Sequence, residues 1–102
     1  MSQELVDGAV QAMQSAPIQA TPRGALSVIG RGIAYIIDLG GDKVKSLGLE
    51  GVIKILEQAY QTSVIDANFE SVPDYIEDPL EAWGKKLIRP IVTQLFGAIT
   101  GA

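Results

Sequence analysis

Apolar residues recur at helical spacing in the first half of the chain. Residues 2–16 carry one broad apolar face, and Pro17 ends the pattern because proline cannot continue a helix. Residues 22–39 form the next amphipathic stretch. Thr21 and Pro22 mark its start, since a capping hydroxyl followed by proline at the first helical position is a typical helix opening. Two helices are therefore predicted in this half.

The second half of the chain contains two more stretches of this kind. Residues 47–62 have the cleanest amphipathic spacing, and Ser46 is placed to cap them. Residues 79–99 follow Asp78, which we expect to cap the last helix. Pro90 lies in the middle of this stretch, where it removes one backbone hydrogen bond and predicts a kink.

No stretch alternates apolar and polar residues as a half-buried strand would. The sequence therefore predicts an all-α fold, a small bundle of about four helices that forms a single helical domain over residues 1–102. Short connections make consecutive helices antiparallel neighbours. The predicted helices are residues 2–16, 22–39, 47–62 and 79–99, the last one kinked at Pro90.

The predicted helix over residues 22–39 has apolar side chains on more than one side, as a central helix would. Gly30 and Ala34 lie one turn apart and form a flat patch on it. An interior glycine costs a helix up to ~1 kcal/mol, so we expect a second helix to approach closely there. The narrow apolar arc of this helix consists of Leu26, Ile29, Ile33, Ile36 and Ile37.

The apolar content of the chain exceeds what a small helical bundle readily buries. Without tyrosine and with glycine included, 56 of the 102 residues are apolar, about 55%, whereas a typical domain reaches about 45–50% on the same count. A subunit interface is the simplest place for this surplus. A membrane surface and a pocket for an apolar ligand are the alternatives. The predicted interface residues are Gly30, Ala34, Phe69, Tyr75, Trp83 and Phe96.

Residue types that the chain lacks exclude several chemistries. Without Cys there is no disulfide, no thiolate zinc site and no cysteine nucleophile, and without His there is no Ser-His-Asp triad or imidazole ligand. A net charge of −4 argues against a nucleic-acid partner. No pair of carboxylates is combined with a nucleophile or a recognisable pocket motif. We therefore expect neither an enzyme nor a cofactor.

An acidic segment without basic residues covers residues 63–77. Counted from Asp66, its spacing resembles an EF-hand calcium loop. Ser71 stands where that loop needs glycine for a sharp turn, and Pro73 stands where a backbone N–H is needed. We therefore expect a solvated acidic loop and no metal site. The weak calcium-loop candidates are Asp66, Asn68, Glu70, Asp74 and Glu77.

A basic patch of Lys85, Lys86 and Arg89 lies on the last predicted helix, about one turn from the acidic residues that open it. One interpretation is that these side chains form ion pairs with the acidic segment. The other is that they contact anionic lipid, with Trp83, Phe96 and the charge-free tail inserted at a membrane surface.

These features favour a non-catalytic helical interaction or assembly protein that acts as a homo-oligomer, of the viral structural or bacterial accessory type. The alternatives are a membrane-surface or lipid-associated protein that uses residues 83–102, and a small carrier of an apolar ligand. The first residues are acidic where a secretory signal would be basic, and Arg31 interrupts the longest apolar run. The expected compartment is therefore the cytoplasm.

Overall fold

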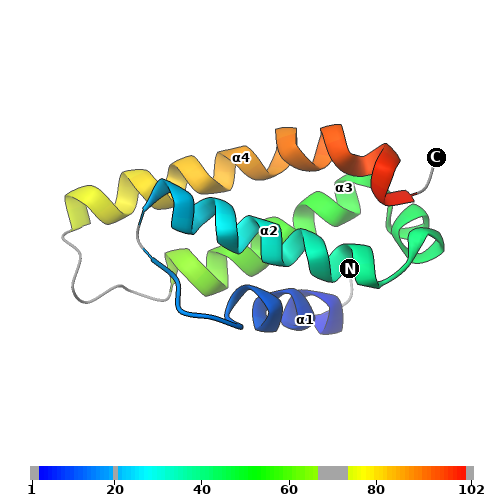
Figure 1. Cartoon of the computed structure of the whole chain (residues 1–102), viewed down its shortest axis with the longest axis horizontal. Coiled ribbons are helices and arrows are strands. Elements are labelled where there is room, and N and C mark those ends of the chain that lie inside the picture. Colours follow the sequence, from blue (N-terminus) through cyan, green and yellow to red (C-terminus); the bar gives the residue numbers. More distant parts are fainter. Residues whose placement is uncertain (1–2, 20, 67–73, 101–102) are drawn as a thin grey trace.

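The computed structural model describes residues 3–19, 21–66 and 74–100, with the backbone alone for residues 74–81. Its elements are α1 (Gln3–Met13), α2 (Pro22–Asp38), α3 (Gly41–Tyr60), the π-helical turn η1 (Gln61–Ile65) and α4 (Asp74–Thr100). Consecutive helices run in opposite directions, so α2 and α4 are parallel to each other (Figure 1). The predicted all-α bundle of four helices is confirmed, and the described residues contain no strand.

The four helices form a ring in the order α1, α2, α4, α3. Each helix packs against its neighbours in this ring, and α2 also contacts α3 across the centre. Within the described residues α1 and α4 do not pack against each other. Helix α2 therefore lies between α1 and α4, with α3 behind it (Figure 1). Among the described elements, no helix covers one long side of α2 and the adjoining side of α4.

The predicted boundaries of the first two helices hold to within a few residues. Helix α1 ends at Met13, three residues before the predicted end, and the Ser15 hydroxyl donates to the Ala12 carbonyl at 2.7 Å in the turn that follows. Helix α2 begins as predicted, because the Thr21 hydroxyl accepts a hydrogen bond from the Gly24 N–H at 3.0 Å.

The prediction that the third helix covers residues 47–62 with a cap at Ser46 is wrong in detail. Helical structure begins at Gly41 and is interrupted at Gly48, whose φ of 75° and ψ of 167° lie in a region that only glycine adopts readily. The residues from Gly41 to the interruption thus form a short helical piece that was not predicted. The main part of α3 ends at Tyr60 and continues as the π-helical turn η1.

The last helix begins earlier than predicted. Helix α4 starts at Asp74, so Asp78 lies inside the helix and does not cap it. The helix continues through Pro90 to Thr100. Pro90 is exposed, so the carbonyl that it leaves without an N–H partner can bond to water, and the proline does not end the helix.

Among the described side chains, α3 contributes more fully buried ones than any other helix, so the core is centred on α3. The apolar arc predicted on α2 is only partly buried. Leu26 and Ile37 are 45% and 51% exposed, whereas Ile29 and Ile36 of the same arc are buried. The arcs on α2 and α4 are wider than the surface that their neighbours cover, so part of each remains open. The fully buried core includes Met13, Val28, Ile36, Val44, Ile53, Ile55, Leu56, Tyr60, Ile88 and Val92.

Candidate interaction surface

Large apolar side chains are exposed on only one side of the described structure. Four of them are exposed, Leu26 and Ile37 on α2 and Trp83 and Leu95 on α4, and none lies on α1 or α3. Their exposed fractions range from 40% to 51%. Scattered single apolar residues are normal on protein surfaces. The confinement of all four to two neighbouring helices is therefore the unusual feature.

One close contact shows how α2 and α4 lie side by side. A Cβ atom added to Gly84 would be 3.3 Å from the Cβ of Ala25, so these two residues lie level. They are 59 positions apart in the sequence, and the two helices are parallel (Figure 1), so α2 and α4 residues about 59 positions apart lie near the same level. Leu26 therefore lies near the level of Trp83, and Ile37 near that of Leu95.

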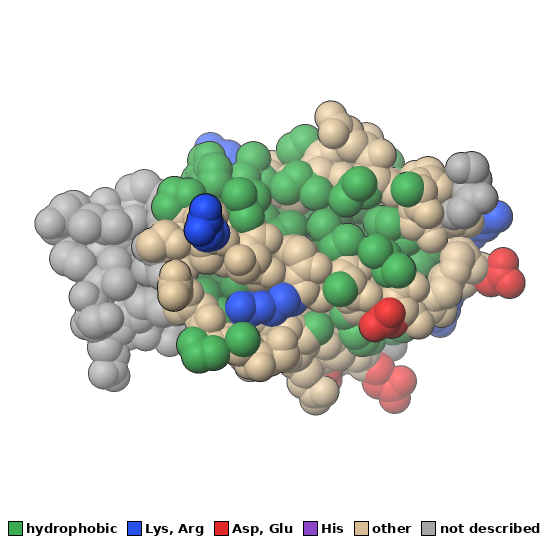
Figure 2. All heavy atoms as spheres, in the orientation of Figure 1, with side chains coloured by type: hydrophobic (Ala, Val, Ile, Leu, Met, Phe, Trp, Pro, Cys, Tyr) green, Lys and Arg blue, Asp and Glu red, His purple; other side chains and the backbone are tan. Residues whose placement is uncertain are grey.

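Small and half-buried apolar residues join the four exposed ones into a continuous surface, which we call the α2–α4 face. Figure 2 shows hydrophobic side chains gathered over α4 and its border with α2, while Lys or Arg and Asp or Glu side chains lie over and just below α2 in this view. After Arg89 the rest of α4 carries no charge. The α2–α4 face consists of Leu26, Gly30, Ala34 and Ile37 from α2 and Trp83, Leu87, Ile91, Leu95 and Ala98 from α4.

The flat patch of Gly30 and Ala34 is exposed at the middle of this face. A Cβ added to Gly30 would meet no heavy atom of the described residues within 4 Å, so no described helix approaches closely there. The close approaches occur instead at Gly32, next to Met13 and Leu56, and at Gly8, against the ring of Tyr35. Gly30 therefore costs α2 helix propensity without any packing requirement inside the bundle.

Of the other predicted interface residues, only some lie on the α2–α4 face. Trp83 lies on the α2–α4 face at 40% exposure. Phe96 is half-buried and packs against the core from the α3 side of α4. Phe69 lies outside the described residues, and Tyr75 is described by its backbone alone, as part of α4.

The calcium-loop candidates lie largely outside the described part of the chain. Asn68 and Glu70 are outside it, and Asp74 and Glu77 are placed by their backbone within α4. Asp66 is exposed, and its carboxylate accepts a hydrogen bond from the Gln61 side chain at 3.0 Å. The described residues contain no cluster of three or more acidic side chains able to hold a metal ion.

Two of the three basic-patch residues bond to α3 or η1. Arg89 forms an ion pair with Glu50 at 2.6 Å, and Lys85 donates to the Gln61 side-chain oxygen at 3.1 Å. Lys86 is exposed. The hydrogen bond from Arg89 lowers the pKa of Glu50 below its ordinary value and raises the pKa of Arg89. Both side chains are open to water, so salt screens the attraction.

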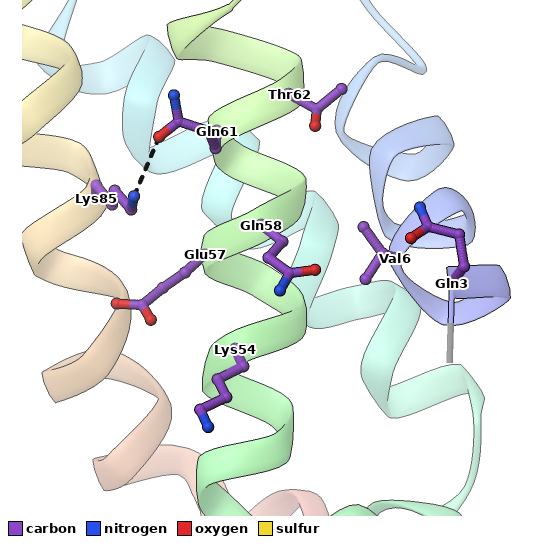
Figure 3. A pocket seen from close by; sticks show the side chains of 8 residues that line it. All are labelled: Gln3, Val6, Lys54, Glu57, Gln58, Gln61, Thr62 and Lys85. Atoms are coloured by element: carbon purple, nitrogen blue, oxygen red, sulfur yellow. Dashed lines mark hydrogen bonds between the residues drawn. The ribbon is translucent and has the colours of Figure 1, made fainter. Parts of the chain in front are cut away.

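A polar groove lies on a different side of the molecule, between α1, α3 and α4. It has a volume of about 680 Å³. Figure 3 shows that Lys54, Glu57 and Gln58 from α3 project into it, with Lys85 opposite. Its lining consists of three amides, two lysines, one carboxylate, the Thr62 hydroxyl and the Val6 side chain. Most of the lining residues are polar, which favours polar contacts in this groove.

None of the described helices is long and apolar enough to cross a bilayer. Comparison with protein-family models, with curated proteins and with solved structures finds no match to this chain. The properties of the surface must therefore be argued from its own residues.

The surplus of apolar residues was visible in the sequence, but Leu26, Ile37 and Leu95 were not among the predicted interface residues. A signal for their exposure was present in the width of the apolar arcs. Leu26 and Val28 lie about 160° apart on a helix of 3.6 residues per turn, which is more than one neighbouring helix can cover. The charges at the two ends of α2, Arg23 and Asp38, are a second signal that was missed.

Proposed function

We propose that this protein is a non-catalytic helical interaction protein that acts as a homo-oligomer, with the α2–α4 face as the contact between copies. The observation that carries the proposal is the confinement of every exposed large apolar side chain of the described residues to α2 and α4. An exposed apolar surface rimmed by polar residues is typical of protein interaction sites. A glycine at its centre that no packing within the chain requires is consistent with close approach from outside.

Two observations favour this proposal over binding at a membrane surface. Trp83 lies on the α2 side of α4, whereas Arg89 and Phe96 lie on its α3 side, more than 100° away around a helix of 3.6 residues per turn. An interfacial helix would need these groups on one face. In addition, Arg89 is already paired with Glu50. Among the described residues the grooves are lined mainly by polar side chains, which gives a carrier of apolar ligands less support.

The test measures the mass of the purified protein by light scattering or sedimentation, from micromolar to near-millimolar concentration. We expect the mass to rise towards that of a dimer or a larger oligomer. Ile37→Gln removes the most exposed apolar side chain of the face. Burying half of such a side chain contributes about 1 kcal/mol per copy, so each pair of copies loses about 2 kcal/mol and the dissociation constant rises ~30-fold.

Lys54→Gln is the matched control, since Lys54 is exposed on α3 at the opposite side of the molecule and has no role in the proposed contact. It should leave the mass profile unchanged. A monomeric protein at every concentration would refute self-association. Flotation of that monomer with anionic but not neutral liposomes would then support the membrane-surface alternative, and an apolar molecule retained in native mass spectrometry would support the carrier.

A further inference from the structure

On the exposed side of α2, charged, large apolar and small residues follow one another in nearly the same order from either end of the helix. Arg23 and Asp38 are both exposed and stand at its two ends, followed inwards by the large apolar side chains Leu26 and Ile37. The small residues Gly30 and Ala34 lie between them. The midpoints of these three pairs all fall between residues 30 and 32. The surface is thus basic, large, small, large and acidic in order along the helix.

We propose that the occupant of the α2–α4 face is a second copy of this chain, related by a two-fold axis that makes α2 antiparallel to its counterpart. This inference rests on the proposed self-association and adds its geometry. In this arrangement Arg23 of one copy meets Asp38 of the other at both ends of the contact, and Leu26 meets Ile37. The small residues face each other at the axis, where they allow two backbones to approach closely.

Charge complementarity is the observation that selects this occupant. Neither Arg23 nor Asp38 takes part in an ion pair within the described part of the chain. They are 15 positions apart, which corresponds to about 22 Å along a helix. A parallel arrangement of two α2 helices would bring Arg23 next to Arg23 and Asp38 next to Asp38. Only the antiparallel one places opposite charges together at both ends.

The two-fold axis placed at the centre of α2 also pairs α4 with the α4 helix of the other copy. Helices α2 and α4 are parallel, and Ala25 of α2 lies level with Gly84 of α4, 59 positions later in the sequence. A centre near residue 31 on α2 therefore lies level with a centre near residue 90 on α4. The same rotation then places Trp83 of one copy opposite Ala98 of the other, a large side chain against a small one. Both are exposed. A bulky residue facing a small one is the complementarity that a self-matching surface requires.

The test is a pair of charge reversals, Arg23→Asp and Asp38→Arg, made separately and together and followed by sedimentation of the purified protein. Each single variant brings like charges together twice in the dimer, so we expect the dissociation constant to rise on the order of tenfold or more. In the double variant, an acidic residue at position 23 again meets a basic residue at position 38 of the other copy. Its dissociation constant should therefore return close to that of the unchanged protein. Lys54→Asp, an exposed reversal on α3, is the control.

Gly30→Leu tests the centre of the same contact. Within the chain the added side chain meets no heavy atom within 4 Å at its Cβ, so the monomer keeps its helical content while the dimer is lost. If the unchanged protein dimerises but the double reversal does not recover from the single ones, the antiparallel geometry is overturned and the proposed self-association stands. If the unchanged protein is monomeric throughout, both proposals fail.

Discussion

Alanine in place of Gly30 and alanine in place of Gly84 should change the free energy of unfolding in opposite directions. Both glycines lie inside helices, so each substitution gains up to about 1 kcal/mol of helix propensity. The Gly30 position is open, so Gly30→Ala keeps that gain. At Gly84 the new Cβ would overlap the hydroxyl of Tyr60 and lie 2.7 Å from its Cζ atom. The Tyr60 ring is fully buried and cannot swing aside.

Overpacking of a core costs about 1–3 kcal/mol. Because the Tyr60 ring is rigid, we expect Gly84→Ala to cost about 3 kcal/mol, the upper end of this range. After the propensity gain the net loss is about 2 kcal/mol. For a domain of this size 1 kcal/mol corresponds to about 4–8 °C in melting temperature. Gly30→Ala should therefore melt several degrees higher and Gly84→Ala roughly 8–16 °C lower. Urea unfolding followed by circular dichroism measures both changes in the free energy of unfolding, and thermal unfolding measures both melting temperatures. Both are done at a dilution where the chain is monomeric. Shifts of the same sign would refute the packing described around Tyr60.

Three further predictions concern the backbone and the polar contacts. Gly48→Ala should destabilise the protein by about 1–3 kcal/mol in urea unfolding because only glycine readily adopts its backbone conformation, whereas Gly97→Ala, at an equally open position, should not. Arg31→Met should cost about 1–3 kcal/mol and speed amide exchange at the end of α1, because the guanidinium donates to two main-chain carbonyls there, at 2.9 and 3.1 Å. Glu50→Gln should remove a stabilisation that exists above the ordinary pKa of this carboxyl, 4.5, and is lost as the pH falls through its lowered folded-state pKa. The stability difference between Glu50→Gln and the unchanged protein should therefore shrink both at acidic pH and at high salt; a difference that persists at acidic pH would contradict the role given to Arg89.

The helices could be predicted from sequence because their signals are local. Thr21 and Pro22 mark the start of α2 through a hydrogen bond that spans only three residues. The interruption at Gly48 gave no such signal, since a glycine within an amphipathic pattern is compatible with a continuous helix. The early start of α4 was missed because Asp78 and Pro79 also form a good opening sequence. Which of two valid starts is used depends on more than local sequence.

The location of the interaction surface depends on the arrangement of the helices, which periodicity does not contain. Leu26 and Ile37 belong to an apolar arc whether it faces the core or a partner. Their exposure follows from the position of α2 between α1 and α4, and this order was not predictable from the individual helices. The surplus of apolar residues was visible in the composition, but its place became clear only when the neighbours of α2 and α4 were known.

The parallel pairing of α2 with α4 also has a consequence for the order of events during synthesis. Contacts such as that between Ala25 and Gly84 join residues 59 positions apart, and closing so long a loop is an entropically unfavourable and slow step in folding. Helices α1, α2 and α3 can associate while α4 is still within the ribosome. The α2–α4 face does not exist until α4 has docked. Incomplete chains therefore lack half of the α2–α4 face, so the proposed self-association requires copies that have finished folding.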